Sequence, residues 1–330
     1  MTLIADAILL TMPTRHTEID CPICGKEAPT VAHGMVAPFI SALSNLPLGQ
    51  QTTLRRCEIC DLSFFDFRYG DEELSALYGH YRGDDYRATR HHWEPWYSRH
   101  VNDVCSTDTD LASERRSFMM KVLDAAQMNA QLACVVDFGG DEGQLFPRVP
   151  TGRRIVCDIS NRELPTGIEH ISMLSELGDV KPDLVIAAHV LEHLPDPLQP
   201  LKDIRRVIAA NGIVYVEVPL DLFRVSQFHA TIRYRKYLWS LVRHRFPFMA
   251  SDFLSGLSRQ FRSSIPKFGV IKQSEHINYF SRRSLQAALT ASGFSVVAHC
   301  SDENMKFGGL RMGCCGIAAR PDTSSSQKGT

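Results

Sequence analysis

The stretch that decides the fold is Ala133–Gly143, with the sequence A-C-V-V-D-F-G-G-D-E-G. The run Cys134–Val136 has the β-branched content of a buried strand, and Asp137 stands where that strand would end. A glycine turn follows, made by Gly139, Gly140 and Gly143. Gln144–Phe146 are then expected to open a helix. A strand, a glycine turn and a helix form the usual cradle for a nucleotide-like cofactor, although the same pattern also fits a plain turn.

Further apolar runs follow in order along the chain. Arg154–Cys157 predicts a second strand that ends at Asp158, an acid placed to accept hydrogen bonds from ribose hydroxyls. Residues 183–197, D-L-V-I-A-A-H-V-L-E-H-L-P-D-P, predict another strand with His189 at its end. Residues 211–219, N-G-I-V-Y-V-E-V-P, read as a turn and one more buried strand.

The order of these motifs resembles that of class I S-adenosylmethionine-dependent methyltransferases over roughly residues 110 to 320. The acid-x-Gly-x-x-x-Gly loop departs from the G-x-G-x-x-G fingerprint, which disfavours a pyrophosphate cofactor. Asp141 stands where that family often has a glycine, so its backbone must adopt a conformation that a non-glycine residue tolerates. The resemblance implies an α/β, Rossmann-like, seven-stranded sheet and S-adenosylmethionine as cofactor. Its implied cofactor-binding residues are Asp137, Gly139, Gly140, Gly143, Asp158 and His189.

Composition sets the remaining bounds. A chain of 330 residues that is 44% hydrophobic can form one large and one small domain. The net charge of −1 gives no global field for nucleic acid or membrane. No apolar run reaches the ~18 residues that cross a bilayer, and Leu3–Met12 contains an acid and lacks a basic leader. We expect a cytoplasmic protein, in which the 10 cysteines serve as reduced thiols or metal ligands.

Two C-x2-C pairs near the start predict a metal site. They are Cys21-Cys24 and Cys57-Cys60. Each pair can place two thiolates on one tight turn, and two such turns complete a tetrahedral zinc site. With no open position the zinc would be structural. The alternatives are two unrelated cysteine pairs or a redox role, and neither pair opens the βαβ unit that a redox motif favours.

The sequence divides into a zinc-binding domain (1–70), an aromatic-rich linker (71–108) and a methyltransferase domain (109–320) that contains a helical insert (221–273). Residues 321–330 are polar and predict a disordered tail. The linker either packs on the main domain or brings its tyrosines to the mouth of the active site. Those tyrosines include Tyr78, Tyr81, Tyr86 and Tyr97.

A four-cysteine domain followed by tyrosines and a cofactor domain resembles the nucleotide-sugar C-methyltransferases of deoxysugar pathways. In that subgroup a base removes the proton beside a sugar carbonyl, and the enolate carbon attacks the methyl group. The subgroup normally carries a further C-terminal substrate domain that has no counterpart here, so the acceptor stays open.

The insert from Asp221 to Gln273 carries 10 basic residues and only two acids, Asp221 and Asp252. Aromatic residues alternate with the bases. Three interpretations compete: a solvated helical lid, a clamp for a phosphate or diphosphate on the acceptor, and a patch that touches anionic lipid. Nucleic acid ranks last because the rest of the chain is not basic.

Two Glu-His pairs supply the candidate catalytic groups. The segment Ser274–Ser281 resembles the part of the sugar C-methyltransferases that faces the acceptor, and the resemblance implies a role for its Glu-His pair in the base. An imidazole can take a proton at neutral pH, which favours His276 as the base, with Glu275 either orienting it or raising its pKa. Alternatively, His276 only packs the segment. The pair Glu192-His193 fits a structural or cofactor-pocket role, with His193 as a second candidate base.

These observations predict an S-adenosylmethionine-dependent methyltransferase with a small-molecule acceptor, favoured as a nucleotide-linked sugar or related carbohydrate. Carbon is the favoured site of methylation. The alternatives are an O-methyltransferase of a glycan, lipid-linked sugar or secondary metabolite, and a non-catalytic binding module that keeps the fold. No nucleic-acid partner is expected, and peripheral membrane contact through the basic insert stays open.

Overall fold

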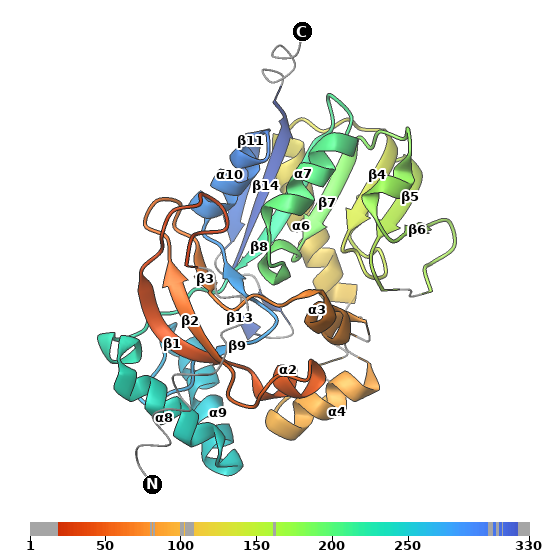
Figure 1. The fold of residues 1–330 in the computed structure, drawn as a ribbon. Coiled ribbons are helices and arrows are strands. Elements are labelled where there is room, and N and C mark those ends of the chain that lie inside the picture. Colours follow the sequence, from red (N-terminus) through yellow and green to blue (C-terminus); the bar gives the residue numbers. More distant parts are fainter. Residues whose placement is uncertain are drawn as a thin grey trace.

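Seven strands form the larger sheet of the computed structural model, in the order β11-β14-β8-β7-β4-β5-β6 (Figure 1). The structure describes residues 19–79, 81, 83–99, 102, 109–160, 163–302, 306–307, 310–311 and 313–322. The strand bounds are β4 Leu132–Phe138, β5 Thr151–Cys157, β6 Glu169–Ile171, β7 Leu184–Ala188, β8 Ile213–Leu220, β11 Phe294–Asp302 and β14 Gly313–Pro321. All pairings are parallel except those of β14, which runs antiparallel to both β8 and β11. This sheet confirms the expected seven-stranded, Rossmann-like fold.

Helices cover both faces of this sheet because its central strands are apolar on both sides. Val135 and Leu184 point into the layer that holds α6, whereas Val136 and Val185 pack in the layer that holds α7 and α10. The helix bounds are α6 Thr109–Ala125, α7 Leu198–Val207 and α10 Arg282–Ala291. The candidate cofactor residues stand at the ends of predicted strands. Those strands are therefore central strands of a three-layer structure.

A second sheet has five strands, in the order β10-β3-β2-β1-β9. Its N-terminal strands are β1 Thr30–Val36, β2 Gln51–Arg56 and β3 Ser63–Phe65, and its edges are β9 Lys272–Gln273 and β10 Asn278–Tyr279. The sheet therefore joins the cysteine-containing segment to the stretch around Glu275 and His276. The cysteine turns also share a buried cluster with α7 and α10, so the two sheets are packed together.

The insert is helical, as expected. It contains η3 Gln227–Ala230, α8 Ile232–Val242 and α9 Arg245–Arg262, which lie at the end of the molecule away from the seven-stranded sheet (Figure 1). Helix α2 Pro38–Leu43 lies between the two cysteine pairs in the sequence, and the short helices α3 Asp71–Tyr78 and α4 Asp84–Trp93 lie between the second pair and α6. Two short 3-10 turns, η1 Leu174–Leu177 and η2 Leu191–His193, flank β7, and the strands β12 Lys306–Phe307 and β13 Leu310–Arg311 pair with each other. No helix in the described part of the chain has the length and apolar character to cross a bilayer.

One local prediction was wrong. Gln144–Phe146 do not open a helix, and residues 141–145 form turns instead. The reason lies in Pro147, because a residue that precedes proline is pushed away from the α region. Two further calls lie outside the described residues: the apolar stretch Leu3–Met12 and residues 323–330 of the expected tail. The domain boundaries stay predictions.

Candidate active site

The glycine loop lies directly after β4 and makes a tight cradle. Gly139 has φ +70°, and a Cβ atom there would stand 2.6 Å from Val190 Cγ2. A Cβ on Gly140 would stand 2.5 Å from Asp137 Cγ. Larger residues therefore do not fit either position. Gly143, with φ +72°, closes the turn.

Asp137 is the buried acid of this cradle. Its Oδ2 has no hydrogen-bond partner among the described residues. Burial raises the pKa of Asp137 to about 7, with Arg115 opposing the rise and Asp158 adding to it. A buried carboxylate oxygen without a donor is a costly feature. It fits the ammonium group of a methionine moiety, so the residues present suit S-adenosylmethionine.

Asp158 stands after β5, as expected, and is tied to the glycine loop. Its Oδ2 accepts a hydrogen bond from the backbone N–H of Asp141 at 3.1 Å, and its Oδ1 accepts one from the N–H of Ser160 at 2.7 Å. Asp141 has φ +49°, a left-handed conformation that aspartate tolerates better than most residues. The departure from glycine is therefore accommodated, and Asp158 is hydrogen-bonded to the loop that follows Asp137.

His189 follows β7 and also has a positive φ, +59°. Its Nε2 lies 3.1 Å from Glu217 Oε1, on the neighbouring strand β8. Burial, aided by Arg115, lowers the pKa of His189 to about 4, so the ring is neutral and donates to Glu217. Glu217 is buried, which favours its neutral form, but Arg115 and His189 outweigh this and lower its pKa to about 2.

Arg115 explains why this carboxylate stays ionised. Arg115 Nε donates to Glu217 Oε1 at 2.9 Å, and the hydroxyl of Tyr215 donates to Oε2 at 2.6 Å. Glu217 thus has three donors from α6, β7 and β8. These contacts to Glu217 fix the position of His189 directly after β7.

His276 is paired with Asp221. The His276 Nδ1 lies 3.2 Å from Asp221 Oδ2, at the end of β8. Burial opposes the charged imidazole, but the hydrogen bond and charge of Asp221, with Glu192 and Glu275 nearby, raise the pKa of His276 to about 9. Asp221 also lies 3.8 Å from Arg259 Nη2. Since Nδ1 faces Asp221, Nε2 is the nitrogen that can exchange a proton with an acceptor.

His193 and His276 come together from distant parts of the chain. Their ring centroids are 4.8 Å apart. His193 Nδ1 lies 3.0 Å from the hydroxyl of Tyr78 and 3.1 Å from the carbonyl oxygen of Glu275. Burial and the charge of His276 lower the pKa of His193 to about 3. One histidine is therefore held neutral while its neighbour is held charged.

Glu192 lies between the two histidine regions. It is fully buried, and neither of its carboxylate oxygens has a hydrogen-bond partner among the described residues. Burial raises its pKa to about 7, and His276 opposes that rise. Its Oε1 lies 3.5 Å from His189 Nδ1. Glu192 thus connects the cofactor side of the site to His276.

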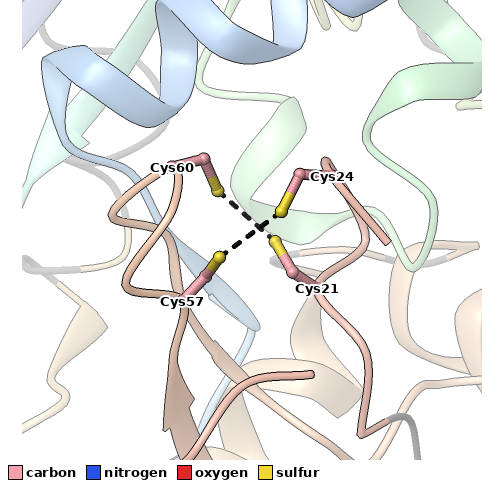
Figure 2. A group of neighbouring side chains, drawn as sticks. All are labelled: Cys21, Cys24, Cys57 and Cys60. Atoms are coloured by element: carbon pink, nitrogen blue, oxygen red, sulfur yellow. Dashed lines mark hydrogen bonds between the residues drawn. The ribbon is translucent and has the colours of Figure 1, made fainter. Parts of the chain in front are cut away.

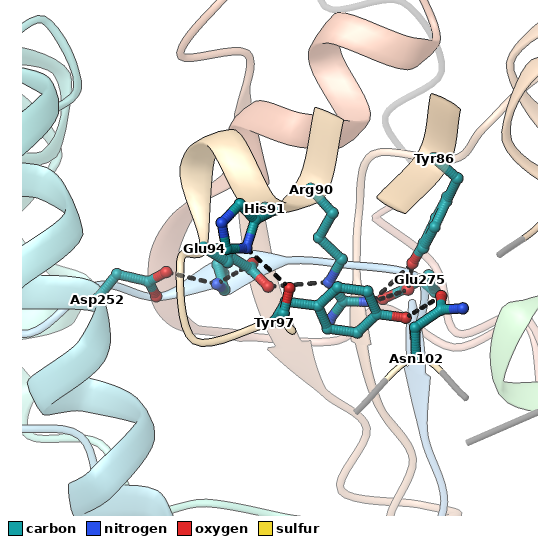
Figure 3. A network of polar contacts seen from close by, with 9 residues as sticks. Tyr86, Arg90, His91, Glu94, Tyr97, Asn102, Asp252 and Glu275 are labelled. Carbon is teal, nitrogen blue, oxygen red and sulfur yellow. Dashed lines mark hydrogen bonds and ion pairs between the residues drawn. The ribbon is translucent and has the colours of Figure 1, made fainter. Parts of the chain in front are cut away.

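Glu275 does not orient His276 directly. Its Oε1 accepts hydrogen bonds from Tyr86 and, at 2.6 Å, from Arg90 Nη1, as Figure 3 shows. Burial favours neutral Glu275, but Arg90 and Tyr86 lower its pKa to about 2. The orienting contact expected of Glu275 is made by Asp221 instead. Glu275 acts on the site through its carbonyl group, which faces His193.

The four N-terminal cysteines come together as predicted (Figure 2). Cys21 Sγ lies 3.4 Å from Cys60 Sγ, and Cys24 Sγ lies 3.4 Å from Cys57 Sγ. All four sulfur atoms lie within 4.8 Å of one another. Four thiols on two turns fit a tetrahedral zinc ion with no open coordination position.

Two other groups bring three ligand-type side chains within 4.8 Å. One is His189, Glu217 and Cys314, and the other is Glu192, His193 and His276. Arg115 already donates to Glu217 in the first group, and its charge would repel a cation. In the second group, the three side chains differ in proton affinity, a pattern typical of acid–base chemistry.

Three residues of the site were not identified from the sequence: Arg115, Glu217 and Asp221. The specific role of Tyr78 was not identified either. Glu217 lies in the predicted strand 211–219, and Asp221 lies just after it. Side chains alternate between the two faces of a strand, so these two residues, four positions apart, are expected on the same face. That signal was present. Arg115 and Tyr78 lie on helices whose packing no local pattern reveals.

Comparison with known proteins gives one family match. Residues 111–299 match the family model described as a methyltransferase domain. Curated proteins give no match. Similar solved structures include N-methyltransferase NodS from Bradyrhizobium japonicum WM9 with S-adenosyl-L-homocysteine (12% identity, TM-score 0.38), covering 62% of this chain and 86% of that chain. Another is the N-terminal domain of EvdMO1 with S-adenosyl-L-homocysteine and D-fucose (16% identity, TM-score 0.33), covering 64% and 83%.

Proposed function

Because this chain belongs to the methyltransferase-domain family, we propose that it transfers the methyl group of S-adenosylmethionine to a carbohydrate acceptor, favoured as a nucleotide-linked sugar. The observation that carries the proposal is the joining of two sites at one sheet edge. The cradle with its partnerless Asp137 oxygen lies after β4, and the His193–His276 pair lies beside Glu192. A cytoplasmic setting belongs to the same proposal.

The cofactor residues divide into two roles. The carboxylate of Asp137 would bind the ammonium group of the cofactor, and the glycines 139, 140 and 143 would let its methionine end approach the backbone. Asp158 would bind the ribose hydroxyls. His189 would stand near the methyl group. When bound, S-adenosylmethionine supplies an activated methyl group, so the protein has to align the acceptor, exclude water and move one proton.

His276 is the proposed base. Its Nε2 would take the proton from the acceptor carbon beside a carbonyl and leave an electron pair on that carbon. The cofactor would supply the methyl group for that pair, its methyl–sulfur bond breaking to leave S-adenosylhomocysteine. Asp221 is a positioning residue that holds Nδ1 and stabilises the charged imidazole. A pKa near 9 makes His276 a strong base that is mostly protonated at neutral pH. The reaction should therefore accelerate as the pH rises.

The tyrosines of α3 and α4 support a sugar acceptor. Tyr78 contacts His193 and Tyr86 contacts Glu275, which supplies polar and aromatic groups around the acceptor side. Oxygen methylation of a glycan, lipid-linked sugar or secondary metabolite needs the same single base. Mass and NMR analysis of the product separates the two, because a C-methyl group leaves the number of hydroxyl groups unchanged.

Calorimetric titration tests cofactor binding. We expect S-adenosylmethionine and S-adenosylhomocysteine to bind, NADH not to bind, and Asp137→Asn to weaken binding by about 10- to 100-fold, since a charge-assisted hydrogen bond is lost. Asp203→Asn, a partly exposed acid on α7, is the matched control and should bind normally. Absence of binding, or equal binding by Asp137→Asn, would overturn the assignment of the cradle.

We propose zinc for the four-cysteine cluster, in a structural role. Elemental analysis of the purified protein should find zinc, and Cys24→Ser should lower its content, whereas Cys300→Ser should not. Cys300 is a free thiol on β11, away from the cluster. Zinc content that is the same in both variants would contradict the site.

A further inference from the structure

Helix α9 carries a stripe of large apolar side chains that are 40% to 81% exposed. We call it the α9 stripe: Phe246, Phe253, Leu254, Leu257 and Phe261. Phe246 and Phe261, near its two ends, are 75% and 81% exposed. At 3.6 residues per turn these positions fall on one side of the helix. Monomeric proteins seldom expose an apolar row of this length without a partner.

The opposite side of α9 is fixed to the molecule. Phe248, Asp252 and Ser255 are buried there. Asp252 Oδ2 lies 2.5 Å from Lys272 Nζ, which also contacts Glu94 Oε1 at 2.5 Å (Figure 3). The hydroxyl of Ser255 accepts a hydrogen bond from the N–H of Val270 at 2.7 Å. Because the inner side is anchored by these contacts, the α9 stripe cannot turn inward.

The exposed charges of the insert are positive. Six exposed bases lie in it: Arg224, Arg233, Lys236, Arg243, Arg262 and Lys267. Lys267 stands beside Phe268, which is 58% exposed and extends the apolar surface. The two acids of residues 221–273 face inward, since Asp221 pairs with His276 and Asp252 with Lys272. The insert therefore presents apolar and cationic groups with no exposed acid.

We propose that α9 lies on the surface of an anionic phospholipid bilayer, with the stripe in the acyl–headgroup boundary and the bases on lipid phosphates. Exposed apolar side chains on a helix, together with a surplus of Lys and Arg, form the arrangement that binds in the plane of such a surface. Negatively charged lipids attract basic groups within a Debye length. An apolar partner alone would not account for the exposed bases. The proposal stands independently of the methyl-transfer reaction.

Vesicle flotation with the full-length protein tests the proposal. The protein should float with vesicles of phosphatidylcholine and phosphatidylglycerol, should not float with phosphatidylcholine alone, and should be released by salt. The double variant Phe246→Ser/Phe261→Ser should bind about tenfold more weakly or worse, because two apolar anchors are lost. Arg243→Gln/Arg262→Gln should weaken binding about tenfold, through loss of the electrostatic part.

The matched control is Met173→Ser, which removes another exposed apolar side chain, 59% exposed, far from the insert in the sequence. It should bind like the wild type. Circular dichroism verifies that each variant is folded. The proposal is overturned if the wild type ignores anionic vesicles or if the phenylalanine variant binds as well as the wild type. It is also overturned if the wild type ignores vesicles and sedimentation shows a dimer that this variant converts to a monomer.

Discussion

Two histidine–carboxylate pairs lie on the same edge of the sheet and have opposite proton affinities. His189 lies 3.1 Å from Glu217, and its pKa is lowered to about 4. His276 lies 3.2 Å from Asp221, and its pKa is raised to about 9. The distances are alike and both pairs are buried. Contact with a carboxylate therefore does not decide the charge of an imidazole.

The difference lies in what else faces each carboxylate. Glu217 receives Arg115 at 2.9 Å and the hydroxyl of Tyr215 at 2.6 Å, so its charge is already compensated. Asp221 has Arg259 only at 3.8 Å, and its charge is left to stabilise His276. A compensated carboxylate leaves burial to dominate the histidine beside it, whereas a less compensated one outweighs burial.

The largest expected effect comes from removing the charged member of the comparison. His276→Gln should lower the rate of methyl transfer by about 10²- to 10⁴-fold, the usual contribution of a general base, with cofactor affinity unchanged. Single-turnover assays and calorimetry measure the two quantities. His299→Gln changes an exposed histidine on β11 and should have the wild-type rate. A His276→Gln enzyme with normal rate would refute the base.

Disrupting the pair formed by neutral His189 and ionised Glu217 should act mainly on the stability of the fold. Arg115→Met leaves Glu217 buried without its cation, and we expect a loss of about 3–5 kcal/mol in the free energy of unfolding. Urea denaturation measures it. Arg153→Met, which breaks a solvent-exposed pair with Glu169, should leave the free energy of unfolding nearly unchanged. The pKa of His189 should also rise in Arg115→Met, toward that of His276, and an unchanged pKa would contradict the compensation argument.

Asp221→Asn should move the pH dependence. Only the neutral imidazole can take a proton, so kcat/KM of the wild type should rise with pH and level off above about 9. Without the Asp221 charge the pKa falls, and the rise should move to lower pH by about one to two units, to a lower plateau because the base is weaker. A rate that falls as the pH passes 9 would mean that the protonated form is active.

The smallest effect is expected at His193, the neutral histidine whose ring packs against that of His276. Tyr78→Phe removes its contact with His193 Nδ1, while the Glu275 carbonyl oxygen still lies 3.1 Å away. One neutral hydrogen bond contributes about 0.5–1.5 kcal/mol, so the rate should fall by roughly 2- to 10-fold. Tyr237→Phe, on α8, should not change the rate. A loss beyond about 100-fold would give Tyr78 a direct catalytic role.

The clustering of the candidate cofactor residues was predictable, because each of them follows a strand that a short apolar run in the sequence indicates. The order of parallel strands brings their carboxyl ends to one edge, which places Asp137, Asp158 and His189 together. The four-cysteine cluster was predictable for a similar reason, since each pair shares one turn. The helix expected after Gly143 does not form, because Pro147 disfavours the helical conformation of the residue before it.

The acceptor side could not be predicted in the same way. The partner of His276 is Asp221, at the other end of the insert, and Tyr78 reaches His193 from the 71–108 segment. The neighbouring Glu275 was the local choice, but its carboxylate, between β9 and β10, accepts a hydrogen bond from Arg90. These contacts depend on the five-stranded sheet, whose strands come from both ends of the sequence.

The most direct measurement of the central claim is an NMR titration of the His276 imidazole, assigned by its disappearance in His276→Gln. The account predicts that His276 keeps its proton until the pH approaches about 9, and that Asp221→Asn lowers this value. A His276 that loses its proton at or below the ordinary value of about 6.5 would contradict it, because Asp221 would then not hold the proton that the proposed base must exchange.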